Sequence, residues 1–265
     1  MKKIAQFAVI VGLATVMGSC TTARLQSTYY PAKEMILEPS TSFVRRDIVH
    51  TVAPGETLWR IGKMYDVGVR DIMRANRLRK PKSLRMGQCL YIPQAAPLRA
   101  VVPLYPSSKW RYIIVHHSAT GEGNALTFHN SHRLKGWESV GYHFIITNGT
   151  KGKSDGHIEA TPRWIKQQNG AHCKAADMNG KSIGICLVGD FSRERVSKKQ
   201  MESLVHLVHL LRKHYNIPLY RVMGHGDVPG AITECPGKYF PWGKLQERLI
   251  VVDRARKRTF GRFSE

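Results

Sequence analysis

A short segment near the C-terminus carries two side chains that bind metals well, His225 and Cys235. Residues 224–237 read GHGDVPGAITECPG, and Gly and Pro favour the turns that can bring both side chains to one point. Imidazole nitrogen and thiolate sulfur are ligands that zinc prefers. Because a catalytic zinc generally has three protein ligands and an open position for water, the rest of the chain must supply a third ligand.

His116 is the candidate for that third ligand. It comes near the end of residues 110–118, a run rich in aromatic and β-branched residues that predicts a buried strand. Neighbouring side chains of a strand point to opposite faces, so only one of His116 and His117 can face a given site. Two neutral imidazoles and one thiolate would leave a bound zinc with a net charge of about +1, which can acidify a water and polarise an amide carbonyl.

Alternating strands and helices surround these residues. Ser197 and Gln200 are spaced as a capping box at the start of a long helix that ends before Pro218. The sequence predicts strands at residues 110–118, 140–147, 157–160, 181–188 and 221–224, and helices at residues 128–134, 197–217 and 242–254. This alternation predicts a mixed α/β fold, with a central mixed β-sheet flanked by helices, over residues 108–254.

A smaller unit precedes this domain, at residues 47–94. Its pattern predicts a β-α-α-β arrangement, in which Thr57 caps the first helix. Three segments resemble the LysM family: residues 54–61 (PGETLWRI), 75–78 (ANRL) and 87–93 (GQCLYIP). The resemblance implies binding to the N-acetylglucosamine-containing glycan of peptidoglycan or chitin, through Gly55, Glu56, Thr57 and Leu78. A structural interpretation, in which these residues only turn the chain and cap the helix, is compatible with that role.

A second resemblance covers residues 110–250. Its motifs are VHHSAT (115–120), GW (136–137), GYHF (141–144), GAH (170–172), SIGI (182–185), GH (224–225) and CPG (235–237). They look like the zinc amidase family shared by bacteriophage amidase lysozymes and catalytic peptidoglycan recognition proteins. This resemblance implies an N-acetylmuramoyl-L-alanine amidase, which cuts the bond between the lactyl group of muramic acid and the first residue of the stem peptide.

The same resemblance implies roles for individual residues. The zinc ligands of the family match His116, His225 and Cys235. Catalytic residues beside the metal match Tyr142 and Thr233, which we expect to hydrogen-bond to the attacking water or to the tetrahedral oxyanion. Residues that line the family's cleft match His132 and His172. Contact with the substrate is one interpretation of these two residues, and a structural hydrogen bond is the other. No carboxylate of the sequence stands out as a general base.

The N-terminus predicts export. Lys2 and Lys3 precede an apolar run at residues 4–17, and two small residues come directly before Cys20. This pattern looks like a lipoprotein signal peptide at residues 1–19, after which Cys20 would be acylated and residues 20–46 would form a tether. An ordinary cleaved signal is the alternative. The expected location is the cell envelope, with the anchor in the outer membrane facing the periplasm.

The composition predicts an anionic partner. The chain has 41 Lys and Arg residues against 19 Asp and Glu residues, a formal net charge of +22. Because export argues against nucleic acid, the expected partners are peptidoglycan and, through the lipid on Cys20, a membrane; no oligomer is implied. Residues 95–107 predict a linker with several prolines, and residues 255–265 a basic tail.

Other functions are compatible with parts of the sequence. A non-catalytic peptidoglycan recognition protein would share the fold, but such proteins commonly lack the metal cysteine, and Cys235 is present. A zinc endopeptidase that cuts within the stem peptide would use similar chemistry. A structural wall-anchoring lipoprotein would leave the metal residues unused. In an oxidising compartment the cysteines after Cys20 could form two disulfides, although no spacing demands it.

Overall fold

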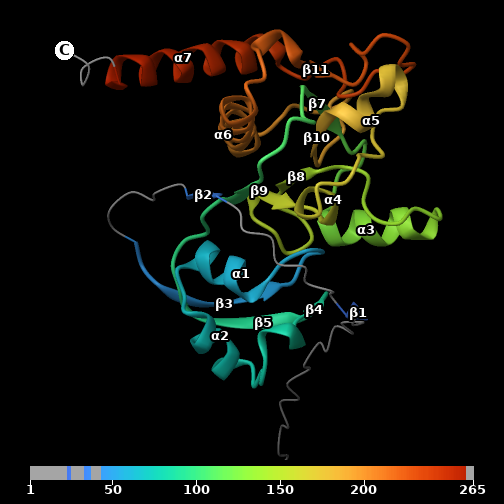
Figure 1. Cartoon of the computed structure of the whole chain (residues 1–265). Helices are drawn as coiled ribbons and strands as arrows, with labels where there is room; N and C mark the ends of the chain where they lie inside the picture. The colour runs from blue at the N-terminus through green and yellow to red at the C-terminus, as the bar shows by residue number, and fades with distance from the viewer. Residues whose placement is uncertain (1–22, 25–32, 37–42, 261–265) are drawn as a thin grey trace, which may run out of the picture.

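The computed structural model describes residues 23–24, 33–36 and 43–260, with side-chain burial for residues 43–254. The predicted signal peptide and Cys20 lie outside these ranges. The chain folds into an N-terminal domain (residues 46–95) and a C-terminal domain (residues 110–260), which pack against each other (Figure 1). Within the described ranges, no helix combines the length and the apolar character needed to cross a membrane.

The N-terminal domain has the predicted β-α-α-β order. Strands β3 (Arg46–Thr51) and β5 (Cys89–Ala95) pair antiparallel, and helices α1 (Leu58–Tyr65) and α2 (Val69–Ala75) lie between them in the chain. A short 3-10 helix η1 (Pro81–Ser83) and strand β4 (Arg85–Met86) complete it. Thr57 caps α1, because its Oγ1 accepts a hydrogen bond from Arg60 N at 3.2 Å. Buried Ile61, Ile72 and Ile92 belong to one core.

The described residues of the C-terminal domain form a five-stranded mixed sheet, as predicted. Its order is β11 (Val222–Gly224), β7 (Tyr112–His117), β10 (Ser182–Leu187), β8 (Phe144–Asn148) and β9 (Asp155–Ala160). The first four strands are parallel, and β9 is antiparallel to β8. The central strands are almost fully buried, which explains their unbroken apolar sequences.

Two helical layers cover the two faces of this sheet (Figure 1). One face carries Ile113 and Val115 of β7 and packs on α6 (Lys198–Tyr215) and α7 (Trp242–Phe260). The other face is covered by α3 (Ala125–Leu134), η2 (Ala175–Asp177) and α5 (Met178–Lys181), and it carries Ile114 and Cys186. Short helices α4 (Pro162–Ile165) and η3 (Leu219–Arg221) connect the elements. His116, two residues after Ile114, faces this second layer.

Local signals explain where the main helix begins. The Ser197 hydroxyl accepts a hydrogen bond from Gln200 N at 3.0 Å, and Gln200 Oε1 accepts one from Ser197 N at 3.3 Å, so the predicted capping box is confirmed. Buried Leu204, Val208 and Leu211 then lie on one side of α6 and face the sheet. The C-terminal helix α7 continues to Phe260, so the backbone of the predicted tail is helical over residues 255–260.

The segment predicted as a linker is packed rather than extended through solvent. Within it, β6 (Val101–Leu104) pairs antiparallel with β2 (Lys33–Ile36), which lies in the predicted tether. Val101 belongs to the core of the N-terminal domain, whereas Val102 and Leu104 belong to the core of the C-terminal domain. Because neighbouring side chains of a strand point in opposite directions, one strand contributes to both cores. A short strand β1 (Ala23–Arg24) also pairs with β4.

Buried polar contacts join the two domains. Lys153 Nζ donates a hydrogen bond to the carbonyl of Thr51 at 2.9 Å, and Arg60 Nη1 donates one to the carbonyl of Ala160 at 3.4 Å. Lys153 also pairs with Glu159 at 3.5 Å. These three charged side chains are all buried. The domains are therefore held together by a shared strand and by desolvated charges, and no disulfide occurs among the described residues.

Candidate metal centre and active site

The candidate metal centre lies at the carboxyl ends of two neighbouring parallel strands. β11 pairs with β7 so that Gly224 lies opposite Val115. Each strand continues by one residue from that pair into a histidine, His225 and His116. The backbone N of His225 donates a hydrogen bond to the carbonyl of Val115 at 3.2 Å, which holds the two histidines side by side. Their ring centroids are 4.8 Å apart.

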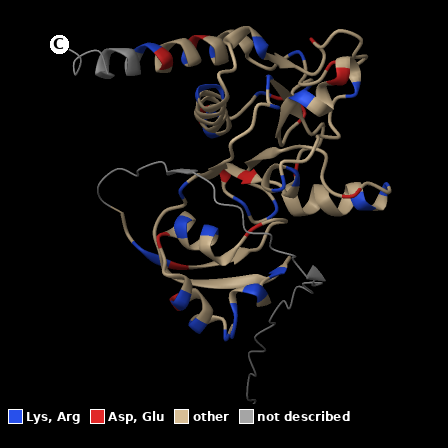
Figure 2. Cartoon of the chain, in the orientation of Figure 1, with Lys and Arg blue, Asp and Glu red and all other residues tan. Residues whose placement is uncertain are grey.

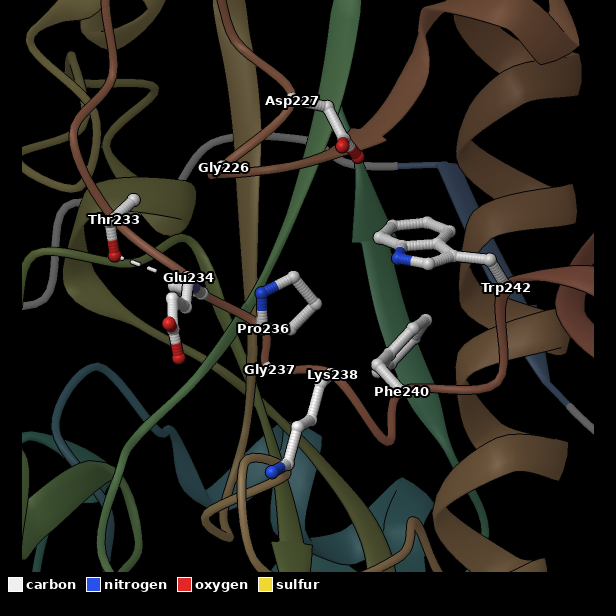
Figure 3. A pocket seen from close by; sticks show the side chains of 10 residues that line it. Gly226, Asp227, Thr233, Glu234, Pro236, Gly237, Lys238, Phe240 and Trp242 are labelled. Atoms are coloured by element: carbon white, nitrogen blue, oxygen red, sulfur yellow. Dashed lines mark hydrogen bonds between the residues drawn. The ribbon is translucent and has the colours of Figure 1, made fainter.

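The loop that follows β11 carries Cys235 back to these histidines. Gly226 N donates to the carbonyl of Cys235 at 2.7 Å, and Asp227 Oδ2 accepts from Gly224 N at 2.9 Å. A Cβ at Gly226 would lie 2.6 Å from the carbonyl oxygen of Thr233, so this close approach requires glycine. The loop lines a pocket of about 450 Å³. Figure 3 shows Pro236 between Glu234 on one side and Phe240 and Trp242 on the other.

The predicted metal ligands converge. The Nδ1 atom of His116 lies 3.6 Å from Cys235 Sγ, and one ligand atom from each of His116, His225 and Cys235 lies within 4.8 Å of the others. Ligand atoms of a tetrahedral zinc site are about 3.3–3.8 Å apart, given zinc–nitrogen and zinc–sulfur bonds of about 2.0–2.3 Å. The three residues therefore fit a zinc ion with only small adjustments.

The protonation of these groups also fits a metal. Burial holds the pKa of His116 well below its usual value, with neighbouring His225 lowering it further, and burial lowers the pKa of His225. Both imidazoles are therefore neutral and can bind a cation. Burial raises the pKa of Cys235 to about 12, although the backbone N–H of His117 lowers it in part. A divalent cation reverses this balance, because a coordinating thiol loses its proton.

His117 points to the other face of the sheet, as the alternation of β7 predicts. Its Nδ1 accepts a hydrogen bond from Phe191 N at 3.2 Å and lies 3.6 Å from Asp190 Oδ1. Its backbone reaches the site instead: the N donates to Cys235 Sγ at 3.4 Å, and the carbonyl oxygen lies 4.0 Å from the same sulfur.

Tyr142 and Thr233 both lie near the ligands. The ring centroid of Tyr142 is 5.2 Å from that of His116. Burial raises the pKa of Tyr142 well above its usual value, and the nearby Cys186 and Cys235 raise it further, so its hydroxyl stays protonated and can donate. Thr233 is exposed, and its Oγ1 accepts a hydrogen bond from Cys235 N at 3.2 Å (Figure 3). Thr233 therefore supports the metal loop while its hydroxyl remains open to solvent.

His132 lies on the open side of the site. Its Nδ1 accepts a hydrogen bond from Gly141 N at 3.1 Å, which positions the ring next to Tyr142 at a centroid distance of 6.2 Å. Trp137 packs on His132 at 4.6 Å and is 41% exposed. In the sequence, Trp137 stands out only as part of the GW motif. Its exposure beside the site becomes visible in the structure alone.

The structure distinguishes between the two interpretations of His172. Its side chain is buried, with 8% of the residue exposed, and its Nδ1 lies 3.0 Å from Nε2 of His116. The imidazole packs behind a metal ligand instead of lining an open cleft. Of the two interpretations of His172, the structure favours the structural hydrogen bond, which the GAH motif alone could not distinguish from a substrate contact.

Two of the predicted glycan-binding residues, Gly55 and Glu56, lie close to the domain interface. Glu56 is 4% exposed, and its Oε2 bonds to His50 Nε2 at 2.8 Å and accepts from Ala53 N at 2.7 Å. A Cβ at Gly55 would come within 3.4 Å of Pro162 N in the other domain. The Glu56 side chain is therefore engaged within the protein, as the structural interpretation expects, and contact of this residue with glycan stays a prediction. Thr57 and Leu78 are half-buried.

Comparisons with known proteins support the interpretation of both domains. The family described as N-acetylmuramoyl-L-alanine amidase matches residues 106–238, and the LysM domain matches residues 50–93. The endolysin of Enterobacteria phage T3 is 34% identical over 163 residues, which are 58% of this chain and 99% of the relative. Peptidoglycan-recognition protein LB of Drosophila melanogaster is 34% identical over 48% of this chain and 54% of its own length.

Among solved structures, the N-acetylmuramoyl-L-alanine amidase LysC from Clostridium intestinale URNW shares 32% identity over 55% of this chain and 90% of its own, with a TM-score of 0.45. The family and sequence matches, together with the fold and the site, define a peptidoglycan hydrolase. The chain belongs to the N-acetylmuramoyl-L-alanine amidase family and carries a LysM domain ahead of its enzymatic domain.

Proposed function

We propose that the chain is a zinc-dependent amidase of the cell envelope, in which His116, His225 and Cys235 hold the metal. The observation that carries this proposal is the approach of their three ligand atoms to within 4.8 Å at the carboxyl edge of the sheet. The bond cut is the amide between N-acetylmuramic acid and the L-alanine of the stem peptide, in keeping with the family to which the chain belongs.

Bound zinc would supply an acidified water and a polarised amide carbonyl. The protein supplies the rest of the stabilisation. Tyr142 keeps its phenolic proton and donates a hydrogen bond to the developing tetrahedral oxyanion. Thr233, whose Oγ1 accepts a hydrogen bond from Cys235 N, offers a second, neutral hydroxyl. His132, held by Gly141 N, presents its Nε2 side to the substrate beside Tyr142.

The loop carries two carboxylates. Asp227 accepts a hydrogen bond from Gly224 N, and Glu234 is exposed and lines the pocket beside the loop (Figure 3). The stabilisation of the oxyanion by Tyr142 and Thr233 does not depend on either carboxylate.

The N-terminal domain is proposed to tether the enzyme to glycan strands. Its basic side chains gather around α2, η1 and β4, away from the C-terminal domain (Figure 2). The exposed members of this basic face are Arg70, Arg74, Arg77, Arg79, Lys80, Lys82 and Arg85. Such a face attracts the anionic groups of a cell wall through long-range forces that salt weakens.

Attachment to the outer membrane through an acylated Cys20, facing the periplasm, completes the proposal. The support is the signal-like sequence before Cys20. Mass analysis of the mature N-terminus is the test: a diacylated or triacylated cysteine at position 20 supports the anchor, whereas a cleaved, unmodified N-terminus contradicts it.

Digestion of purified peptidoglycan tests the reaction itself. The zinc-loaded chain is expected to release stem peptides that begin with a free L-alanine amino group, identified by mass, while Cys235→Ser protein releases none. Cleavage inside the stem peptide would replace the amidase with an endopeptidase. Binding without any cleavage would leave a recognition protein.

A further inference from the structure

A second imidazole stands behind the candidate zinc ligand His116. His172 Nδ1 lies 3.0 Å from His116 Nε2, and the rings meet edge to face at a centroid distance of 4.9 Å. Two ring nitrogens at this distance form a hydrogen bond only if one carries a proton and the other accepts it. The other nitrogen of His116, Nδ1, faces Cys235 Sγ at 3.6 Å. The state of Nδ1 therefore decides whether His116 Nε2 carries the shared proton or accepts it.

A metal ligand nitrogen carries no proton, so a zinc-bound His116 uses Nδ1 for the metal and keeps its proton on Nε2. His116 Nε2 then donates, and His172 Nδ1 accepts. If the bond were reversed, His116 would carry its proton on Nδ1 and could not bind the metal. The contact with His172 therefore selects one of the two tautomers of His116.

The surrounding backbone is built to hold the His172 ring in this place. A Cβ at Gly184 would lie 2.4 Å from His172 Cδ2, and a Cβ at Gly170 would lie 2.3 Å from the same atom. Any other residue at either position would displace the ring. The two glycines belong to different segments, the loop before η2 and β10, so the His172 ring is packed against the backbone of both.

The main chain of His172 is tied down as well. Asn179 Oδ1 accepts hydrogen bonds from the backbone N of His172 and of Cys173, both at 2.8 Å. Gly170 N donates to the carbonyl of Asn179 at 2.9 Å. Backbone, ring and acceptor atom are thus all positioned from elements that do not themselves bind the metal.

We propose that His172 is a positioning residue for zinc: it accepts the Nε2 proton of His116 and so fixes the tautomer and ring angle that present Nδ1 to the metal. This inference rests on the proposed function, since it assumes that His116 is a ligand. It differs from the predicted role of His172 as a substrate contact, for which the ring is too deeply buried. Partners of this kind typically change metal affinity by about 10- to 100-fold.

A matched set of variants tests the role of the acceptor atom. His172→Asn places a carbonyl oxygen near the position of Nδ1, whereas His172→Leu has a similar size and shape without an acceptor. His172→Gln carries its amide one methylene further out, away from the Nδ1 position. The measurements are the zinc dissociation constant of the full chain, by competition with a chelator, and the urea midpoint of the metal-free chain.

His172→Leu is expected to bind zinc about 10- to 100-fold more weakly than the native chain. The zinc dissociation constant of His172→Asn is expected to lie closer to that of the native chain than to that of the Leu variant. The zinc dissociation constant of His172→Gln is expected to lie closer to that of the Leu variant. In the zinc-loaded native chain, the His116 Nε2 proton is also expected to exchange slowly by NMR, and to exchange faster when His172 is Leu. A purely structural role would change the urea midpoint without this order of zinc affinities.

Gly184→Ala provides an independent variant, because it keeps the His172 side chain and only displaces its ring. Gly184→Ala is expected to weaken zinc binding, as His172→Leu does. If the Leu variant does not fold, the zinc affinities of Gly184→Ala, His172→Asn and His172→Gln together test the inference. Native affinity in His172→Leu, or equal losses in the Asn and Leu variants, would overturn the inference. If the native chain itself bound no zinc, the metal proposal would fail together with it.

Discussion

Lys153 Nζ donates a hydrogen bond to the backbone carbonyl of Thr51 at 2.9 Å, so a side chain of the C-terminal domain is bound to the main chain of the N-terminal domain. The same ammonium group pairs with Glu159 at 3.5 Å. The Lys153 and Glu159 side chains are only 4% and 1% exposed. The contact is therefore a buried charge pair that links the LysM domain to the amidase domain, and not a surface salt bridge.

Lys153→Met is expected to destabilise the whole chain. Removing one member of a buried pair leaves the other charge without compensation and costs about 3 kcal/mol in the free energy of unfolding. Burial already raises the pKa of Glu159, even though Lys153 lowers it, so the unpaired carboxyl will take up a proton more readily. The loss in the free energy of unfolding caused by Lys153→Met is therefore expected to become smaller as the pH falls from 7 to 5. Urea unfolding at several pH values is the measurement.

The control for this prediction is two residues away. Lys151 pairs with Glu122 at the surface, with both side chains largely exposed, so Lys151→Met is expected to cost less than about 1 kcal/mol. Equal losses in the two Met variants would contradict the buried network. Two separate unfolding transitions in the native chain would show that the domains are not coupled through it.

The candidate metal ligands were predicted from residue type, from their places in the chain and from the resemblance to the zinc amidase family. His116 and His225 lie at the ends of two strands that were recognisable from their apolar runs, and the structure shows that these strands are parallel neighbours. Cys235 could be added because a Gly- and Pro-rich loop joins it to His225. The mixed sheet and the β-α-α-β unit followed from the same local periodicities.

What could not be predicted depends on space left by residues far apart in the chain. The direction of the His172 ring is set by the missing side chains of Gly170 and Gly184, and no pattern around His172 reports them. The division of Val101 and Val102 between two cores likewise requires both domains to be in place. The four-residue strand β6, which contains Pro103, was therefore interpreted as part of a linker.

Removal of the metal is expected to abolish the amidase activity. Zinc contributes several kcal/mol of transition-state stabilisation, so chelation or Cys235→Ser should lower the rate by at least about 100-fold. Added zinc should restore the chelated native chain but not the variant. Cys89→Ser, at an exposed position of the N-terminal domain, is the matched control and should keep full activity. Unchanged hydrolysis in the chelated chain would exclude zinc from the reaction.

His143 is expected to make the protein sensitive to acid. Its Nδ1 accepts from Gly184 N at 2.9 Å, and its Nε2 donates to the carbonyl of Gln168 at 3.1 Å, so the buried ring is neutral. Burial lowers the pKa of His143 to about 3, partly offset by the hydrogen bond to Gln168. Because the unfolded chain binds a proton near pH 6.5 and the folded chain does not, the contribution of His143 is complete above that pH and is lost as the pH falls towards 3.

The expected slope is about 1.4 kcal/mol of unfolding free energy per pH unit for this residue between pH 6 and pH 4. His143→Asn keeps an acceptor near the Nδ1 position but does not titrate, so its stability curve should be flatter by about that amount over this range. Above pH 7 the two curves should run parallel, which serves as an internal control. Equal slopes below pH 6 would show that His143 is already protonated in the folded chain.

Tyr142→Phe is expected to reduce turnover without loss of zinc. The phenolic hydroxyl stays protonated because burial, with Cys186 and Cys235 nearby, raises its pKa well above the usual value, so it can act as a donor throughout the working pH range. Removing one such donor to an oxyanion typically lowers kcat by about 10²–10³-fold. Tyr112→Phe, at the opposite end of β7, is the matched control and should be nearly neutral. Steady-state hydrolysis of a muramoyl peptide, with zinc content measured on the same samples, is the assay; full kcat in the Tyr142 variant would remove this hydroxyl from the mechanism and leave oxyanion stabilisation to the zinc and Thr233.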